Sequence, residues 1–347
     1  MRLERLTQDA QCFASGCSYA EQFRGKTFVI TGATGLIGSV MVRCLHTLNE
    51  SYGLGIRICG VVRDKEKAKA QYEGIEIEFI SFADFQSCRL PEGSVDYLVH
   101  AAAPTRSDYF VSHPVETIEA VMGLTKDALT YCYHRQVGSM VYLSSMEVYG
   151  AVLDDSVPLT EEMQGHLDPM NVRSSYSMGK RMAENLCVAY HSEQGVPVKV
   201  ARLAQTFGAG VTLDDTRVFA FIAKSALRSE DVILETDGQS RRCYCYTTDA
   251  VDAILLLLLK GKNGEAYNVA TPSTYCSIKE MAELVTERFN PQGKVICKGL
   301  IGGKYPLPHK LRLSVDKLMA LGWQPHYDLP AMFERLMGWY GLGTELS

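Results

Sequence analysis

The chain has 347 residues, a mass of 38.4 kDa and a formal net charge of −5, with 46% apolar and 22% charged residues. This length indicates two domains, or one large domain with an appended lobe, and the composition is that of an ordinary globular protein. The mild acidity argues against a nucleic-acid partner, which normally requires a basic surface.

The cysteines and the charge distribution give expectations about compartment. None of the eleven cysteines forms a Cys-x-x-Cys pair and no histidine cluster lies beside them, so reduced, buried thiols and no metal site are expected. Charged residues between Arg2 and Asp9 interrupt any signal sequence. The most apolar run, Ile254–Leu259, is far shorter than the roughly 20 residues of a membrane span and indicates a buried helix. A cytoplasmic protein with no membrane partner is expected.

The first two thirds of the chain alternate between strand-like and helix-like segments. Residues 1–25 are expected to form an extension with a short surface helix. Short apolar segments, predicted as strands, follow at 27–31, 56–62, 75–80, 95–103, 140–143 and 198–203. Segments of helical spacing lie at 36–48, 114–135 and 175–193. This alternation is typical of βαβ units and predicts an α/β fold with a Rossmann-type, doubly wound parallel sheet over residues 26–204.

Beyond residue 204 the segments become shorter and more polar, for example at 214–217. Residues 205–347 are expected to form mainly a smaller C-terminal α/β lobe that binds substrate, with a cleft between the two parts. Further elements are predicted as helices at 249–260, 277–289 and 330–340 and a surface loop at 299–308. Ser277 and Glu280 have the spacing of a capping box at the start of the second of these helices.

A glycine-rich segment, Thr31–Gly38, follows the first predicted strand directly and precedes a helix. Its GxxGxxG spacing puts glycines where the backbone must turn sharply and approach a pyrophosphate, while the helix N-terminus supplies N–H groups. The segment therefore predicts a dinucleotide cofactor. The residues assigned to this contact are Gly32, Thr34, Gly35, Leu36, Ile37 and Gly38.

The end of the second predicted strand leaves the choice of cofactor open. Asp64 would accept hydrogen bonds from the adenosine ribose and repel a 2′-phosphate, which favours NAD. Arg63 directly before it would accommodate that phosphate, which favours NADP. Both residues are assigned to the cofactor site, which is predicted to hold NAD or NADP tightly.

Tyr176 and Lys180 are four residues apart on a predicted helix, so their side chains share one face. A tyrosine phenol titrates near about pH 10, and a nearby ammonium lowers its pKa by favouring the phenolate. The pair therefore predicts a base for the hydroxyl of a sugar or alcohol. Ser145 follows a core strand, at the edge where ligands bind in open α/β sheets, and can share a hydrogen bond with the same substrate oxygen.

Together these motifs resemble the extended short-chain dehydrogenase/reductase family, and within it the NAD-dependent nucleotide-sugar epimerases, dehydratases and decarboxylases. The resemblance covers roughly residues 26–340. It rests on TGATGLIG at 31–38, HAAAP at 100–104, SSMEVYG at 144–150, YSMGKRMAE at 176–184, RLAQTFG at 202–208, Arg242 seven residues before Asp249, and LGW at 321–323. It implies transient oxidation at C4 of a nucleotide sugar with no net redox change, in which Tyr176 takes the hydroxyl proton.

The resemblance also implies ligand contacts. Asp84 and Phe85 would lie at the adenine, and the alanines of the HAAAP motif would line the cofactor beside Tyr176 and Lys180; these are Ala101, Ala102 and Ala103. Gln205 and Arg242 would face the nucleotide diphosphate, although many relatives have asparagine in place of Gln205. Thr105 and Arg106 would lie near the sugar, where Arg106 either pairs with a uronate carboxylate or a phosphate, or lies in solvent.

Glu147 bears on which reaction is catalysed. In the 4,6-dehydratases and UDP-glucuronate decarboxylases that the motif resembles, a glutamate stands two residues after the catalytic serine or threonine. A carboxylate there can act as a base at C5 or position water, or it can simply face solvent. The dehydratases usually have an aspartate just before it, whereas this chain has Met146, which cannot donate a proton. The absence of this acid counts against standard dehydration. The YxxGKRxAE run at 176–184 and the Pro-containing segment after HAAA resemble the decarboxylases most, so the resemblance makes decarboxylation of UDP-glucuronate the narrowest prediction.

Two other classes of function remain open. A keto-sugar or carbonyl reductase using NADPH, with net hydride transfer, would use the same triad, and Arg63 slightly favours it. A non-enzymatic binder would usually lack the tyrosine or the lysine. The helices predicted at 114–135 and 175–193 carry long apolar stretches, and the matching pair in relatives forms a four-helix interface. A homodimer is therefore expected, with the alternative that both helices only cover the sheet.

Overall fold

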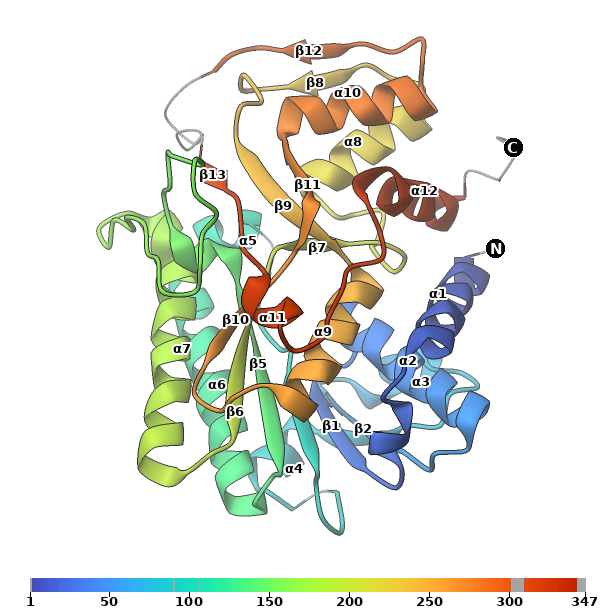
Figure 1. The fold of residues 1–347 in the computed structure, drawn as a ribbon, viewed down its shortest axis with the longest axis vertical. Coiled ribbons are helices and arrows are strands. Elements are labelled where there is room, and N and C mark those ends of the chain that lie inside the picture. The colour runs from blue at the N-terminus through green and yellow to red at the C-terminus, as the bar shows by residue number, and fades with distance from the viewer. Residues whose placement is uncertain (1, 90, 106, 301–308, 342–347) are drawn as a thin grey trace.

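The computed structural model describes residues 2–89, 91–105, 107–300 and 309–341. Seven parallel strands form the main sheet, in the order β10-β6-β5-β4-β1-β2-β3 (Figure 1). Their bounds are β1 Thr27–Thr31, β2 Arg57–Val62, β3 Glu78–Ser81, β4 Tyr97–His100, β5 Ser139–Ser145, β6 Val198–Leu203 and β10 Ala266–Val269. The predicted Rossmann-type doubly wound sheet is confirmed.

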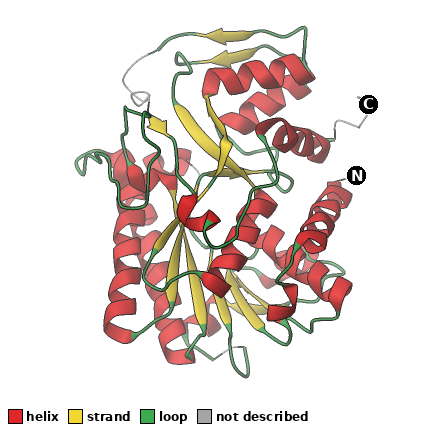
Figure 2. Cartoon of the chain, in the orientation of Figure 1, coloured by secondary structure: helices red, strands yellow, loops and turns green. Residues whose placement is uncertain are grey.

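Helices cover both faces of this sheet (Figure 2). The side chains of β1 point alternately to the two faces of the sheet, and each face has its own hydrophobic core. Phe28 and Ile30 join one buried cluster, and Val29 joins the other. The first cluster packs under α2 (Leu36–Tyr52) and α9 (Thr247–Lys260). The second packs under α6 (Pro114–Arg135) and α7 (Ser175–Gln194), which lie side by side.

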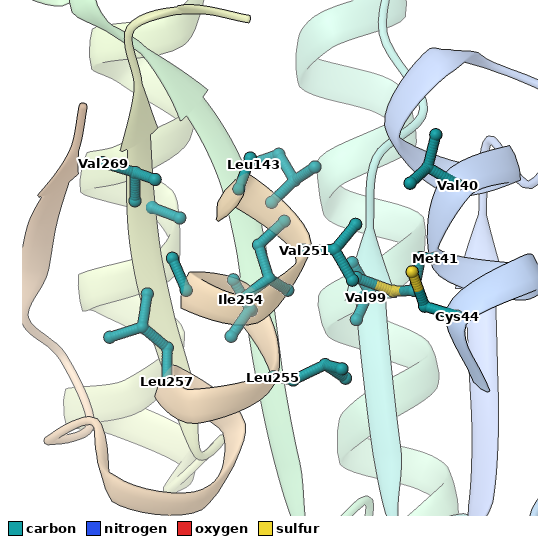
Figure 3. Close-up of a cluster of buried hydrophobic side chains, with 14 of the residues drawn as sticks. Val40, Met41, Cys44, Val99, Leu143, Val251, Ile254, Leu255, Leu257 and Val269 are labelled. Atoms are coloured by element: carbon teal, nitrogen blue, oxygen red, sulfur yellow. The ribbon is translucent and has the colours of Figure 1, made fainter. Parts of the chain in front are cut away.

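Helix α9 has apolar residues on nearly all of its faces, and it lies buried between the sheet and α2. Figure 3 shows its side chains together with those of α2 and of β4, β5 and β10. The labelled residues are Val40, Met41, Cys44, Val99, Leu143, Val251, Ile254, Leu255, Leu257 and Val269. The interpretation of Ile254–Leu259 as a buried helix is confirmed, since Ile254–Leu258 are at most 3% exposed.

The C-terminal lobe is built on a small sheet in which β9 is central and pairs with β7, β11 and β13. A two-stranded ribbon of β8 and β12 and several helices complete it. The bounds are β7 Gln205–Phe207, α8 Val218–Leu227, β8 Val232–Leu234, β9 Arg241–Tyr246, β11 Thr271–Ser277, α10 Ile278–Phe289, β12 Val295–Cys297, β13 Lys310–Leu311, α11 Asp316–Met319 and α12 Leu329–Tyr340. Ser277 and Glu280 form the predicted capping box of α10.

Some elements differ from the expectations. The chain returns to the main sheet through α9 and β10, so residues beyond 204 contribute to both parts, and the division at residue 205 stays a prediction. Helix α1 (Arg2–Gly16), followed by the 3-10 turn η1 (Ala20–Phe23), is longer than a short surface helix and packs against α2, α9 and α12. Strand β4 ends at His100. The predicted loop at 299–308 lies almost entirely outside the described residues.

Five short elements, which were not predicted from the sequence, complete the described fold. They are α3 Lys65–Gln71, α4 Phe82–Gln86, α5 Ser107–Ser112 and the 3-10 turns η2 Met146–Tyr149 and η3 Val172–Ser174. Two turns of helix or fewer give too little periodicity to be recognised from sequence. Among the described residues, no helix is long and apolar enough to cross a membrane.

Candidate active site

A cavity of about 240 Å³ opens at the carboxyl ends of the main-sheet strands, beneath the C-terminal lobe. Both parts of the chain line it, as expected for a ligand site in an open α/β sheet. Most of the predicted site residues meet here. They are Gly32, Gly35, Leu36, Ile37, Gly38, Ala101, Ala103, Thr105, Ser145, Glu147, Tyr176, Lys180, Gln205 and Arg242.

The glycine loop leaves no room for side chains. A Cβ at Gly38 would lie 2.2 Å from the carbonyl oxygen of Gly32, and a Cβ at Gly32 would lie 2.8 Å from the backbone of Ala101. Gly32 also has a positive φ of +68°. Gly35 is the N-cap residue of α2 and has no side chain, so the first N–H groups of that long helix have no capping side-chain oxygen. This bare helix N-terminus fits a pyrophosphate, and the loop is suited to hold a dinucleotide.

The other predicted cofactor residues lie away from the lining of this cavity. Thr34 and Ala102 belong to the same loops but do not line it. Asp64 begins α3, and its Oδ1 accepts the N–H of Lys67 at 3.0 Å, while Arg63 before it is exposed at the end of β2. The Asp64 carboxylate thus already caps a helix, which is a role that the sequence analysis did not assign to it.

Asp84 and Phe85 belong to the short helix α4. The Phe85 ring is 1% exposed and stacks on Tyr131 with 4.4 Å between centroids. The Asp84 carboxylate accepts the Ser81 hydroxyl, whose oxygen in turn caps α4. Burial of the Phe85 ring in the core leaves only its backbone for the predicted contact with adenine.

The predicted catalytic residues lie on β5, on α7 and in the turn η2 that follows β5. Lys180 is 3% exposed, and its Nζ donates to the carbonyl oxygen of Leu143 at 2.7 Å, which fixes the ammonium beneath the strand end. Burial lowers the pKa of Lys180 to about 8. Its Nζ lies 5.8 Å from the centroid of the Tyr176 ring, so the two side chains share the same helix face as predicted.

Tyr176 is held by a second aromatic ring. Phe110 of α5 stacks on it with 4.2 Å between centroids and 2° between planes. Burial raises the pKa of Tyr176 and the charge of Glu147 raises it further, while a hydrogen bond with Ser145 and the charge of Arg217 oppose the rise. Burial therefore favours the neutral phenol, and the Lys180 ammonium, with Nζ 5.8 Å from the ring centroid, favours the phenolate.

Ser145 and Glu147 lie at the end of β5. The Ser145 hydroxyl accepts the N–H of Glu147 at 3.2 Å and so caps the turn η2, in addition to its contact with Tyr176. The Glu147 side chain is half-buried and lines the cavity. Met146 lines it as well, which places a thioether beside this carboxylate where no proton can be supplied.

Two polar atoms on the lobe side of the cavity are buried and have no hydrogen-bond partner among the residues that the structure describes. They are Oε1 of Gln205 and Nε of Arg242. The two residues lie on paired strands, since Gln205 is opposite Tyr244 in the register of β7 and β9. An unpaired buried polar atom costs about 1–3 kcal/mol. The pair therefore fits a polar ligand that supplies both a donor and an acceptor.

Arg217 is a lining residue that the sequence analysis missed, because it treated 214–217 only as a polar stretch. Its guanidinium forms an ion pair with Asp215 at 2.6 Å and lies 4.8 Å from the ring centroid of Phe219. Phe110 was missed too, since neither residue belongs to a recognisable motif. Thr105 lines the cavity as predicted, whereas Arg106 lies outside the described residues.

This combination of a dinucleotide-type glycine loop, a Ser-Tyr-Lys group and a lobe with unpaired polar atoms defines a nucleotide-dependent α/β protein of the short-chain dehydrogenase type. A family model described as the NAD dependent epimerase/dehydratase family matches residues 28–270. The chain belongs to this family, and the resemblance seen in its motifs is confirmed.

Curated relatives agree with this membership. The chain is 31% identical to UDP-glucuronic acid decarboxylase 3 of Arabidopsis thaliana over 303 residues, which cover 87% of this chain and 85% of the relative. It is 32% identical to UDP-glucuronic acid decarboxylase 5 of the same plant over 237 residues, which cover 68% of this chain and 67% of the relative.

Solved structures share the fold. The UDP-glucuronic acid 4-epimerase of Bacillus cereus, in complex with UDP-glucuronic acid and NAD, superposes with a TM-score of 0.72 at 19% identity, covering 90% of this chain and 98% of that one. The dTDP-glucose 4,6-dehydratase of Bacillus anthracis, in complex with NAD, gives a TM-score of 0.72 at 21% identity, covering 91% and 96%.

Proposed function

We propose that the protein is a redox-neutral nucleotide-sugar enzyme that decarboxylates UDP-glucuronate. The observation that carries this proposal is the meeting of Ser145, Tyr176 and Lys180 with the unpaired atoms of Gln205 and Arg242 in one cavity. Ser145, Tyr176 and Lys180 suit proton transfer at a sugar hydroxyl. Nε of Arg242 suits a diphosphate oxygen, and Oε1 of Gln205 suits a donor group elsewhere on the same nucleotide sugar. The decarboxylase names of the curated relatives support the choice of substrate.

We propose NAD as the resident cofactor, held tightly by the glycine loop at Gly32–Gly38. When bound, it accepts a hydride from C4 of the sugar and returns it after the carboxylate has left. Asp64 stands at the end of β2, where an acid disfavours a 2′-phosphate, and the solved epimerase and dehydratase contain NAD. Arg63, next to Asp64, could accommodate a 2′-phosphate, so release of NADP from the purified protein would correct this assignment.

The chain's own residues move the protons. The phenolate of Tyr176, favoured by the Lys180 ammonium, takes the proton of the C4 hydroxyl, while the Ser145 hydroxyl donates a hydrogen bond to the same oxygen. The C6 carboxylate is then β to a ketone. As CO₂ leaves, the C5–C6 electron pair moves toward the C4 oxygen, where Ser145 and the protonated Tyr176 stabilise the developing charge. A proton then returns to C5 before the ketone is reduced again.

The function is tested on the protein as purified, with no cofactor added. Denaturation should release NAD, identified by mass, in an amount close to one per chain. Incubation with UDP-glucuronate should give a product lighter by the mass of CO₂, and UDP-glucose and dTDP-glucose should remain unchanged. Loss of water from either hexose would identify a dehydratase instead. A protein without bound cofactor that consumes NADPH only with a carbonyl substrate would identify the alternative reductase.

Glu147 is proposed to act at C5, as the proton donor or through a positioned water. Glu147→Gln is expected to lower kcat by about 10²-fold, because the neutral amide cannot exchange a proton. Reduced cofactor should still form, at least as fast as in the unaltered protein, since the C4 step does not need this carboxylate and loss of its charge removes one cause of the raised pKa of Tyr176. Stopped-flow absorbance follows that step, and product mass follows the overall reaction. Glu193→Gln, at an exposed position near the end of α7, is the matched control.

The activity should depend on the charge of Lys180. Burial lowers its pKa to about 8, so the ammonium predominates below that pH and is lost as the pH rises through it. Because the cation favours the Tyr176 phenolate, kcat/KM is expected to fall above about pH 8. Lys180→Arg keeps a cation throughout and should lack this decline. A flat profile across this pH range in the unaltered protein would contradict the role of Lys180.

We propose that the protein is a homodimer formed through α6 and α7. Apolar side chains remain exposed on these two neighbouring helices, among them Val115 at 65%, Ile118 at 44% and Met182 at 57%. The unaltered protein should therefore have twice the 38.4 kDa mass of one chain in light scattering. Met182→Glu should shift it to the single mass, whereas Met170→Glu, at an exposed loop residue, should not.

We place the reaction in the cytoplasm. All eleven cysteines are free, and seven of them are buried, which suits a reducing compartment. Fractionation of the source cells should therefore recover the decarboxylase activity with the soluble cytoplasmic fraction.

A further inference from the structure

The N-terminal helix α1 lies outside the matched family region and plays no part in the proposed chemistry. It nevertheless packs between the two parts of the molecule, against α2 and α9 of the main fold and against α12 of the C-terminal lobe (Figure 1). The hydroxyl of Tyr52, at the end of α2, donates to the carbonyl oxygen of Ala14 at 3.0 Å. Tyr19, just after α1, bonds through its hydroxyl to the carboxylate of Asp252 on α9.

Asp9 is the charged residue at the centre of this packing. It is 2% exposed, and its two carboxylate oxygens accept hydrogen bonds from the Tyr246 hydroxyl and from Nη1 of Arg335. Tyr246 ends β9, and Arg335 belongs to α12, where its guanidinium lies 4.5 Å from the ring centroid of Tyr327. One carboxylate of the extension thus joins two separate elements of the substrate lobe.

The strand that Asp9 holds is the one that carries Arg242. Residues 242, 244 and 246 of β9 point to the same face, because side chains alternate along a strand. Phe207 of β7 pairs with Tyr246, and Gln205 of the same strand pairs with Tyr244. The Tyr246 hydroxyl also accepts the N–H of Ala209, just after β7, at 3.4 Å. The contact with Asp9 therefore fixes the end of both strands whose unpaired atoms face the cavity.

Helix α1 also approaches the cofactor side of the cavity. A Cβ placed at Gly210 would lie 3.2 Å from Leu36 and 3.7 Å from Leu6, so these three residues are close neighbours. Leu36 is the first residue of α2 and lines the cavity. Gly210, shortly after β7, thus lies beside both Leu6 of α1 and Leu36 at the start of the phosphate-binding helix.

We propose that α1 is an intramolecular clasp that positions the substrate lobe over the cofactor domain, and that Asp9 is its positioning residue for nucleotide binding. Loss of the Asp9 charge leaves Arg335 without its carboxylate and weakens the hold on Tyr246. The strands β7 and β9 then lose a fixed position relative to the glycine loop. The expected consequence is weaker binding of the nucleotide diphosphate with unchanged retention of the dinucleotide.

The test uses the full chain as purified. Asp9→Asn and Tyr246→Phe are compared with Gln8→Ala, which alters an exposed residue of the same helix. Calorimetry with UDP as the probe is expected to give a Kd about tenfold higher for Asp9→Asn, because binding must then also bring β7 and β9 into position. Tyr246→Phe should show part of this loss. The amount of nicotinamide nucleotide released per chain on denaturation should stay the same in all three variants.

Two results would overturn the proposal. One is an unchanged UDP affinity in a folded Asp9→Asn protein, or in folded Tyr246→Phe if the first variant does not fold. The other is an equal loss of UDP binding and of bound nucleotide, which would indicate general destabilisation. The UDP readout rests on the proposed function. If the unaltered protein binds no UDP, the proposed function fails. Hydrogen exchange then tests the clasp separately. The backbone amides of β7 and β9 are expected to exchange faster in Asp9→Asn than in Gln8→Ala.

Discussion

Tyr176→Phe is expected to lower kcat by about 10²–10⁴-fold, the usual range for loss of a positioned acid–base group. The variant keeps the ring, and therefore the stacking on Phe110 at 4.2 Å, but it removes the hydroxyl that faces Ser145. Because no other phenol lines the described cavity, nothing can replace it at the C4 oxygen. Product formation from UDP-glucuronate, measured by mass, checks the expectation.

The matched control is Tyr190→Phe on the same helix. The Tyr190 hydroxyl lies 3.2 Å from the hydroxyl of Thr130, and neither residue lines the cavity. It should keep full activity. Both variants should retain bound NAD and melt at the same temperature as the unaltered protein. If Tyr176→Phe keeps more than a tenth of the activity while folded and loaded, Tyr176 is not the base and the proposed mechanism fails.

Glu184→Ala is expected to lower the free energy of unfolding by about 3–5 kcal/mol, since it leaves a buried guanidinium without its partner. Glu184 forms an ion pair with Arg202 at 2.7 Å, with both side chains only 11% exposed. The Ser144 hydroxyl also donates to Glu184 at 2.6 Å. This network lies directly beneath the strand end that carries Ser145. Urea unfolding followed by circular dichroism measures the change.

Two further variants separate charge from packing. Adding Arg202→Met to Glu184→Ala should restore part of the stability, because the uncompensated charge is then removed as well. Glu283→Ala breaks an exposed pair with Lys279 on α10, at 3.7 Å, and should cost at most about 0.5 kcal/mol. Equal effects of Glu184→Ala and Glu283→Ala would show that burial of the Arg202 pair adds nothing to stability.

Local patterns in the sequence predicted much of the fold and the core of the site. The alternation of short apolar segments with helical spacing indicated the parallel sheet, and the glycines at 32, 35 and 38 indicated the phosphate loop. The spacing of Tyr176 and Lys180 placed both on one helix face, and the structure brings them to Ser145. These features depend on neighbours within a few residues, so they can be seen without tertiary contacts.

The short helices α3 and α4 were not predicted. Asp64 and Phe85 stay predicted cofactor contacts, and the structure adds that Asp64 caps α3 and that the Phe85 ring packs in the core. A cap and a packed ring are decided by which elements lie next to these residues. The sequence spacing of one or two residues does not show which elements become neighbours in the fold.

By itself, then, the sequence determined the Rossmann-type sheet, the glycine-rich loop after its first strand and the shared helix face of Tyr176 and Lys180, because each follows from short-range periodicity and spacing. Only the tertiary structure decided that Phe110 and Arg217 join the cavity and that Asp9 of the N-terminal helix bonds to β9 and α12. Asp9 meets Tyr246 and Arg335 across 237 and 326 residues of chain. Contacts at such separations come from the packing of whole elements, which buries apolar area that no local pattern specifies.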